Sequence, residues 1–471
     1  MTLASALLAG AQSGVPSSNT PARVFRAGAA ASNITPPLGI SINGYFNDRT
    51  AKGIHDELHA RCLVLDDVYT RVAIVVCDSC MIPREVMDAA KQMIQQRVGI
   101  PTERVLISAT HTHTAPTCIS LLQSDADPNY QSFLAQRIAD GVVRAMTNLQ
   151  PAKIAYGVGQ EPNQVFNRRW RLKPGKMPMN PFGSTNDLVK MNPAIESPDL
   201  VEPAGPIDPD VSIVALESLK GKRIALLANY SLHYVGTGKD EEISADYYGA
   251  FCDRIQELLG ADRQDPPFVA LLSNGTSGDI NNINFRKKGP ARAPYEQVNL
   301  VADAVAREVH RVYKTLKFLD WVPVGSAQKE ILLGVRLPST DDVKRAEEIL
   351  AKAKGRSLRG LDEVYARETV LIKDYPKEVP VIIQTLRVGE LGIAAIPCEV
   401  FAEIGLAIKA RSPFKPTFTI ELANGYNGYL PTPEQHKLGG YETWRARSSY
   451  LEPEASTKIV ETVMELFARW R

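Results

Sequence analysis

The sequence lacks long apolar runs and lacks a marked charge of either sign. No segment approaches the roughly 20 consecutive apolar residues that a bilayer-spanning helix needs. The formal net charge is only +1, which gives no electrostatic basis for binding nucleic acid or an anionic membrane. The composition is that of a globular protein, since 44% of the 471 residues are hydrophobic and 23% are charged. We therefore expect a large buried core and no transmembrane segment.

Cysteines are few and scattered along the chain. Of the six, only Cys77 and Cys80 form a C-x-x-C pair, and no second pair lies at the spacing of a zinc ribbon. Cys77 ends the apolar run Val72–Val76, which predicts a buried strand residue. A redox or disulfide role is the alternative interpretation.

Basic residues are missing from the N-terminus. No Lys or Arg precedes Arg23, although Leu3–Ala11 is apolar and Ala9–Ala11 resembles a signal-peptidase site. Residues 1–24 are either the remnant of a signal segment or an Ala- and Ser-rich leader. The first would place the protein in a secreted or periplasmic location, and the second in the cytoplasm. We expect the folded domain to cover residues 25–471.

Strands and helices alternate in the first half of the chain, which indicates a layered α/β fold. The expected strands are 61–65, 72–77, 105–108, 223–227, 268–272, 381–386 and 391–396. The expected helices are 84–98, 130–148, 295–316, 400–410 and 453–470, with a charged helical segment at 340–373. Residues 171–210 are rich in Pro, Asn and Met and are expected to form an irregular excursion. We predict a single large domain with a mixed β-sheet core flanked by helices.

Two of the seven histidines lie one residue apart, directly after the predicted strand 105–108. In an extended chain residues i and i+2 point to the same side, so the imidazoles of His111 and His113 can reach one point. Imidazole is the commonest side-chain ligand of catalytic zinc. The pair is therefore a candidate metal site, and a polar surface turn is the alternative.

Further polar side chains follow three other apolar runs. His233 follows the run 223–227, Asp279 follows 268–272, and Glu399 follows 391–396. In α/β sheets, functional sites collect beyond the carboxyl ends of the strands. Each residue also has a structural interpretation: a hydrogen-bonded core histidine, a turn aspartate, and an acidic residue near a helix N-terminus. Two or three histidines and a glutamate together make a plausible zinc set.

Short motifs along the chain resemble those of the neutral/alkaline non-lysosomal ceramidase family. They run in order from about residue 25 to the C-terminus. They are Asn33–Pro37 with Gly44-Tyr45, Thr110–Pro116, Asn167–Arg169, Ser244–Gly249, Pro397–Glu399, Asn424–Tyr429, Thr432–Glu434 and Tyr441-Glu442.

The resemblance implies a zinc hydrolase with one Zn²⁺ per chain and a small-molecule substrate, lipid-like compounds included. The implied metal ligands are His111, His233, Glu399 and Tyr429. His113 and Arg168 would line the site, and Tyr441 would add a hydroxyl. Zinc in such a set polarises an acyl carbonyl and lowers the pKa of bound water to about 7. The resemblance does not define the oligomeric state.

Two departures from the family pattern change the expected chemistry. The family places a serine nucleophile in Gly-Asp-Val-Ser-Pro-Asn, but here Asn281 takes the serine's place in Gly278–Ile283. A carboxamide is no nucleophile, so we expect metal-activated water, with Asn281 donating a hydrogen bond to water or carbonyl. Ser277 lies on the other side of Asp279 and is interpreted as a turn residue. Because the catalytic motifs end close to residue 450, we expect no room for the family's C-terminal immunoglobulin-like domain.

The main hypothesis is a zinc-dependent hydrolase of an amide or related acyl bond. His113 would move the proton, because a histidine titrates near neutrality, and Arg168 would stabilise the developing oxyanion. One alternative is an esterase or lactonase that uses the same metal site. The other is an inactive binding homologue, which the loss of the serine at Asn281 favours.

Overall fold

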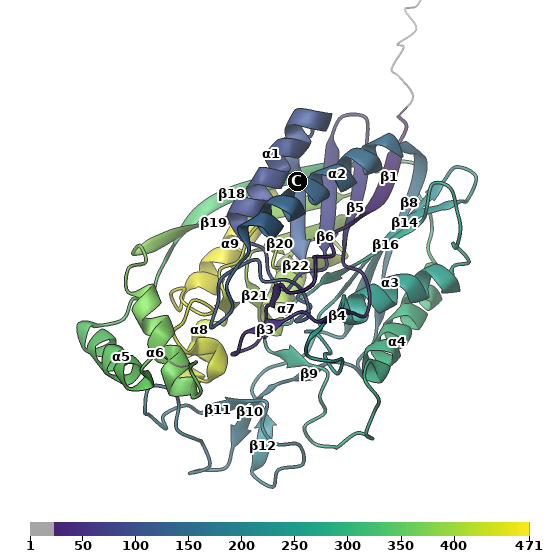
Figure 1. The fold of residues 1–471 in the computed structure, drawn as a ribbon. Helices are drawn as coiled ribbons and strands as arrows, with labels where there is room; N and C mark the ends of the chain where they lie inside the picture. The colour runs from purple at the N-terminus through teal and green to yellow at the C-terminus, as the bar shows by residue number, and fades with distance from the viewer. Residues whose placement is uncertain (1–22, 356, 471) are drawn as a thin grey trace, which may run out of the picture.

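Two β-sheets packed face to face form the centre of the molecule (Figure 1). The structure is a computed structural model that describes residues 23–355 and 357–470, so the leader predicted at residues 1–24 lies almost wholly outside the described residues. The larger sheet has the strand order β16 (Val269–Asn274), β14 (Arg223–Tyr230), β13 (Asp210–Ser218), β8 (Gln150–Gln160), β1 (Arg26–Asn33), β5 (His59–Asp66), β6 (Arg71–Cys77) and β7 (Val105–Ala109). The smaller sheet has the order β18 (Val324–Gly334), β19 (Glu378–Val388), β20 (Leu391–Ile396) and β22 (Thr417–Glu421).

Both sheets are mixed. The pairs β14–β16, β6–β7 and β20–β22 are parallel, and the other neighbours are antiparallel. The alternation of side chains along each strand sorts the core into layers. Leu63 and Leu65 of β5 face the smaller sheet, whereas Cys62 and Val64 face the helices on the outer side.

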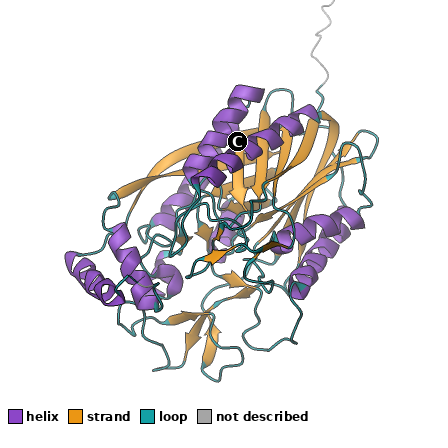
Figure 2. Cartoon of the chain, in the orientation of Figure 1, coloured by secondary structure: helices purple, strands orange, loops and turns teal. Residues whose placement is uncertain are grey.

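Helices cover the outer face of each sheet (Figure 2). The larger sheet carries α1 (Arg84–Val98), α2 (Pro128–Thr147), α3 (Asp246–Leu258) and α4 (Glu296–Tyr313). The smaller sheet carries α7 (Ala402–Arg411) and α9 (Ala455–Ala468). This four-layer arrangement confirms the predicted α/β fold with a mixed sheet and flanking helices.

Two segments differ in detail from the sequence-based expectation. The excursion 171–210 is not wholly irregular, because β10 (Arg169–Leu172) pairs with β11 (Val189–Met191) and β12 (Leu200–Pro203). The charged segment 340–373 is broken into α5 (Thr340–Ala353) and α6 (Leu361–Ile372). The break falls at Lys354 and Gly355, whose φ angles of 50° and 74° cannot continue a right-handed helix.

Short elements complete the described chain. They are β2 (Ser41–Ile42), β3 (Arg49–Thr50), β4 (Gly53–Ile54), β9 (Phe166–Asn167), β15 (Glu242–Ile243), β17 (Ile280–Asn281), β21 (Glu399–Val400), β23 (Tyr429–Leu430) and α8 (Pro433–Leu438). Among the described helices, none combines the length and the apolar character needed to cross a bilayer.

The segments that follow five strands meet at one edge of the sandwich. After β22, Leu422 accepts a hydrogen bond from Ala109 of β7 and donates one to Cys398, which follows β20. After β16, Gly275 donates to Tyr230 of β14, and Gly278 donates to Val400 of β21. These backbone bonds hold the ends of β7, β14, β16, β20 and β22 together, and the polar residues singled out in the sequence lie there.

A substitution at the contact between β1 and α2 tests how the helices pack on the larger sheet. A methyl group added at Gly28 would overlap the carbonyl oxygen of Ala145 and lie 2.8 Å from the backbone nitrogen of Leu149. Because backbone cannot move aside cheaply, Gly28→Ala should lower the free energy of unfolding by about 2 kcal/mol or more. Gly289→Ala is the matched control, since its methyl group would meet open space, and should change stability by less than about 0.5 kcal/mol. Chemical denaturation measures both, and equal stabilities would contradict this packing.

Candidate metal centre

His111 and His113 converge through a turn and not through an extended strand. The strand β7 ends at Ala109, and His111 has a left-handed φ of 76°. Its backbone N–H donates to the carbonyl of Ser79, which holds the turn in place. The two Nε2 atoms lie 3.1 Å apart. The prediction that both imidazoles reach one point therefore agrees with the structure, but the extended-chain reason for it was wrong.

His233 and Glu399 reach the same point from other elements. His233 follows β14, and its Nε2 lies 3.1 Å from Nε2 of His111. Glu399 opens the short strand β21 beside Tyr429 of β23, and its Oε2 lies 3.3 Å from Nε2 of His111. All three side chains are buried, and their ligand atoms lie within 4.8 Å of one another.

Backbone carbonyls fix the orientation of both rings. Nδ1 of His111 lies 2.8 Å from the carbonyl oxygen of Cys80, and Nδ1 of His233 lies 3.1 Å from that of Ser277. A carbonyl oxygen only accepts, so each Nδ1 carries the proton and donates it. In the neutral rings the Nε2 lone pairs then face each other, which is the tautomer that a metal-ligating histidine needs.

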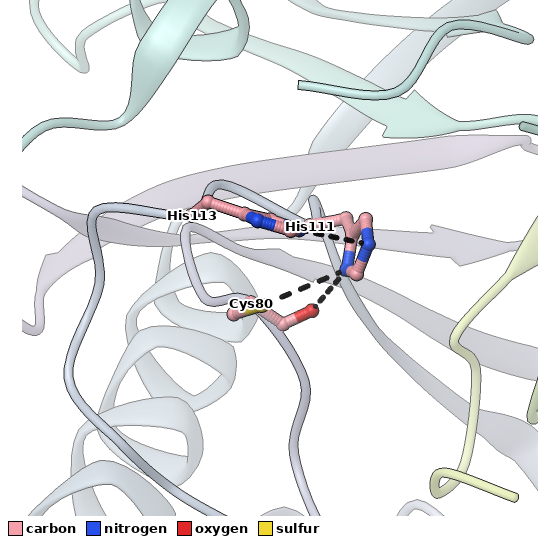
Figure 3. Close-up of side chains that lie close together, drawn as sticks. All are labelled: Cys80, His111 and His113. Carbon is pink, nitrogen blue, oxygen red and sulfur yellow. Dashed lines mark hydrogen bonds between the residues drawn. The ribbon is translucent and has the colours of Figure 1, made fainter. Parts of the chain in front are cut away.

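Cys80 lies on the other side of the His111 ring. Figure 3 shows Nδ1 of His111 facing Cys80 and Nε2 facing His113. The sulfur is 3.8 Å from Nδ1, which is the nitrogen already bound to the carbonyl. Cys80, His111 and His113 also lie close enough to be considered as a metal-binding group. We prefer the group with His233 and Glu399, because it uses the nitrogen of His111 that is free to coordinate.

The carboxylate of Glu399 has one satisfied and one unsatisfied oxygen. Its Oε1 accepts a hydrogen bond of 3.0 Å from the hydroxyl of Tyr426, whereas the buried Oε2 receives none from any described residue. Burial raises the pKa of this carboxyl, but His111, followed by the Tyr429 hydroxyl and Arg168, holds the pKa below its usual value. Burial lowers the pKa of His111, and the Glu399 charge outweighs it and raises the pKa.

This donor set fits a zinc ion. Two imidazole nitrogens converge with a carboxylate oxygen that accepts no hydrogen bond from the described residues, and these are the ligand types of catalytic zinc sites. Tyr429 lies beside Glu399 in the β21–β23 pair, so its phenol oxygen can complete the set. Without a cation or a bridging proton, the facing lone pairs would repel each other.

Arg168 is held against this cluster by a buried ion pair. Its Nε donates to Glu442 at 2.9 Å, its Nη2 donates to the Tyr429 hydroxyl at 3.1 Å, and its Nη1 lies 3.4 Å from Nε2 of His233. The other carboxylate oxygen of Glu442 binds Arg169 at 2.6 Å. Glu442 is fully buried, and one carboxylate therefore positions two guanidinium groups.

His113 is clamped from three sides. The ring of Tyr234 stacks on it with centroids 3.7 Å apart and planes at 17°. Gly44 lies against its edge so closely that an added Cβ would sit 2.6 Å from Nδ1. Arg49 donates to its carbonyl oxygen at 2.7 Å and stacks on the Tyr45 ring. Burial, the nearby His111 and Arg49 lower the pKa of His113.

The remaining predicted residues fall into two groups. Tyr441 lines a small cavity beside the cluster, together with His111, His113, Glu399 and Tyr429. Asn281 points elsewhere, because its amide donates to Asn192 at 2.5 Å, and it is not among the residues that line this cavity.

Asp279 and Ser277 support the site from behind. Asp279 accepts hydrogen bonds from Ala402 at the start of α7 and from Asn167, and burial raises the pKa of Asp279 to about 6. The hydroxyl of Ser277 donates to Glu421 at 2.6 Å, while its carbonyl orients His233. Both are therefore turn residues that position the metal-ligand candidates.

Sequence reasoning missed the roles of Glu442, Tyr426 and Tyr234. Glu442 and Tyr426 lie inside motifs that carried the family resemblance, and their contacts become visible only in the folded chain. Tyr234 had one signal, its place directly after His233.

Comparison with known proteins identifies the family. The family described as neutral/alkaline non-lysosomal ceramidase, N-terminal, matches residues 25–288, and the chain belongs to it. The resemblance predicted from the sequence motifs is thereby confirmed.

Individual relatives are distant. The neutral ceramidase of Pseudomonas aeruginosa is 23% identical, over 89% of this chain and 68% of that protein. Neutral ceramidase B of Dictyostelium discoideum is 25% identical, over 51% of this chain and only 33% of that protein. A crystal structure of the Pseudomonas aeruginosa neutral ceramidase superimposes with a TM-score of 0.71 at 20% identity, covering 95% of this chain and 75% of that chain. The structural match supports the fold.

Substitution of Glu442 tests the buried charge pair. Glu442→Gln would leave the guanidinium groups of Arg168 and Arg169 buried without their shared anion, which should lower the free energy of unfolding by about 3 kcal/mol or more. Glu465→Gln is the control, because Glu465 is half exposed and pairs with Lys329 at the surface, and should cost less than about 1 kcal/mol. Urea unfolding measures the free energy of unfolding of both variants. Similar losses of stability in the two variants would contradict this account.

Proposed function

We propose that this protein is a zinc-dependent hydrolase that cleaves an amide or related acyl C–N bond with water as the nucleophile. The observation that carries the proposal is the convergence of His111, His233 and Glu399 on one buried point, with both Nδ1 protons taken by carbonyls. Tyr429 is the proposed fourth ligand. Family membership supports hydrolysis of an amide bond, since the relatives are named neutral ceramidases.

Zinc in such a set supplies activation of water, whose pKa falls to about 7, and polarisation of the acyl carbonyl. In the hydrolysis, the water oxygen bonds to the acyl carbon, and the C–N bond breaks. The proton that water loses must reach the leaving amine. His113 is the proposed carrier, because its ring is held 3.1 Å from Nε2 of His111.

Arg168 is the proposed stabiliser of the oxyanion. A guanidinium stays protonated, and Arg168 is fixed by Glu442 while Nη1 faces the His233 edge of the cluster. Preorganised charge in a site closed to water is worth more than the same charge in water. The hydroxyl of Tyr441, in the cavity wall, is the proposed additional donor to the substrate.

Asn281 stands where the family pattern has a serine, and its side-chain amide donates a hydrogen bond to Asn192. A serine attack is therefore no part of the proposed mechanism. The same replacement favours, as a second candidate, a binding protein that has lost catalysis. In such a binding protein, the converged side chains of the proposed metal site would have no catalytic role.

Substitutions of two proposed ligands test the function. His111→Ala and Glu399→Gln should each lower bound zinc well below one equivalent and lower kcat/KM for an N-acyl amide by at least about 100-fold, because each removes a ligand. His310→Ala, at a histidine on α4, is the control and should leave both unchanged. Metal analysis and an assay on matched amide, ester and lactone substrates measure the effects.

Full zinc occupancy and unchanged activity in both variants would contradict the proposal. Full occupancy in the wild type without turnover of any substrate would favour the binding protein. Preference for the ester or lactone over the amide would favour an esterase or lactonase.

Gly44 tests the placement of His113. Gly44→Ala would drive a methyl group into the imidazole, so kcat should fall by at least about 10-fold. Gly39→Ala is the matched control, because Gly39 has a similar positive φ of 90° against 104° but open space around it. Both variants carry the same kind of backbone strain, which circular dichroism and thermal unfolding would register. Equal activity in the two variants would exclude a role for the position of the His113 ring.

A further inference from the structure

The cavity at the metal centre is very small. It offers about 20 Å³ beside His111, His113 and Glu399. A single water molecule needs roughly 10–15 Å³ on this measure, whereas pockets for drug-sized ligands span about 300–1,000 Å³. Besides the residues of the cluster, the cavity wall contains Met81, Leu121, Leu122, Tyr426 and Tyr441. A long acyl chain has no room there.

Leu121 and Leu122 of this wall lie at the tip of a tight turn. Leu121 and Ser124 exchange two backbone hydrogen bonds of 3.1 and 3.0 Å, and Leu122 between them has a left-handed φ of 55°. Leu121 and Leu122 are both 6% exposed. They pack in a small apolar cluster with Cys80, Met81 and Val364 of α6.

Gln123 ties this turn to two neighbouring segments. Its amide nitrogen donates to the carbonyl of Phe46 at 3.0 Å, and its amide oxygen accepts from the backbone N–H of Leu358 at 3.1 Å. Leu358 lies in the connection between α5 and α6. The helical pair α5–α6 is therefore bound directly to the wall of the cavity.

A second tie runs through Arg447. Its guanidinium binds Glu368 of α6 at 2.7 and 2.8 Å and donates to the carbonyl of Ser120 at 2.7 Å. Glu368 is fully buried. Because the turn is anchored on both flanks, the cavity cannot widen on this side without breaking several hydrogen bonds and a buried ion pair.

The space on the other side of Tyr45 is large and charged. Tyr45 lines both the small cavity and a groove of about 680 Å³. That groove is bordered by Arg49, Lys52 and Lys239 and by Asp240, Glu241 and Glu242. Side chains of both signs suit a polar or zwitterionic group, whereas an apolar chain would gain no favourable contacts in this polar environment.

We infer that the substrate is a short N-acyl derivative of a polar amine. The small cavity takes the formyl hydrogen or the acetyl methyl group, which is about the size of one water molecule, and the charged groove takes the amine portion. This inference rests on the proposed function and narrows it to a substrate class. Leu122 is the proposed specificity-determining residue, because it lines the small cavity from the anchored turn.

The test compares amides of 2-amino-1,3-propanediol that carry acetyl, butanoyl, hexanoyl or palmitoyl groups, all assayed in the same detergent micelles. The wild-type kcat/KM should fall by at least about 100-fold between acetyl and hexanoyl. In Leu122→Gly, the ratio of kcat/KM for acetyl to kcat/KM for hexanoyl should fall by at least about 10-fold. The positive φ at position 122 suits glycine, so this variant should fold normally. Val68→Gly is the matched control, since Val68 also has a positive φ of 81° but lies in the β5–β6 turn, and should leave the ratio unchanged.

Two outcomes overturn the inference in distinguishable ways. Palmitoyl amide cleaved as fast as acetyl amide would refute the short-acyl class while leaving the proposed hydrolase intact. No cleavage at any chain length by zinc-loaded protein would refute the proposed function itself. An unchanged chain-length ratio in Leu122→Gly, with normal folding, would remove Leu122 from its assigned role.

Discussion

The Nε2 atoms of His111 and His233 lie 3.1 Å apart inside the protein, and the site depends on what lies between them. As neutral rings the two histidines would turn lone pairs toward each other, so a cation or a bridging proton must separate them. Carbonyls of Cys80 and Ser277 fix the proton on Nδ1 of each ring, so neither histidine can relieve the contact by changing tautomer. The Oε2 atom of Glu399, which accepts no hydrogen bond from the described residues, adds an anion to the same point. A divalent cation satisfies all three groups at once.

The fold brings these groups together by ending strands from both sheets at one edge. His111 follows β7, His233 follows β14, and Glu399 follows β20, while backbone bonds from Leu422 join the ends of β7 and β20. Rigid elements thus place the proposed ligands, whereas the turn at Leu121–Ser124 and the α5–α6 pair shape the space around them. Metal binding and substrate selection are therefore assigned to different parts of the chain.

The sequence alone could predict the helices and strands that have periodic apolar residues. It could also predict that polar residues directly after strands are candidates for a functional site. The helix 84–98 matches α1 in both bounds, and the hairpin at 381–396 is found in β19 and β20. The strands β1 and β8 were missed, because they are rich in Ala and Gly and gain their order from neighbouring strands. Of the proposed ligands, His111, His233 and Glu399 follow predicted strands, whereas Tyr429 came from the family resemblance alone. Glu442 and the carbonyl of Cys80 act across long stretches of sequence, and no local pattern signals such contacts.

X-ray absorption at the zinc edge of the purified protein tests the central claim most directly. The account predicts one zinc per chain with only nitrogen and oxygen ligands at about 2.0–2.2 Å and the multiple scattering of imidazole rings. A sulfur shell near about 2.3 Å would contradict it, because Cys80 would then be a ligand and His111 would coordinate through Nδ1. Protein that binds no zinc under saturating conditions would contradict it as well.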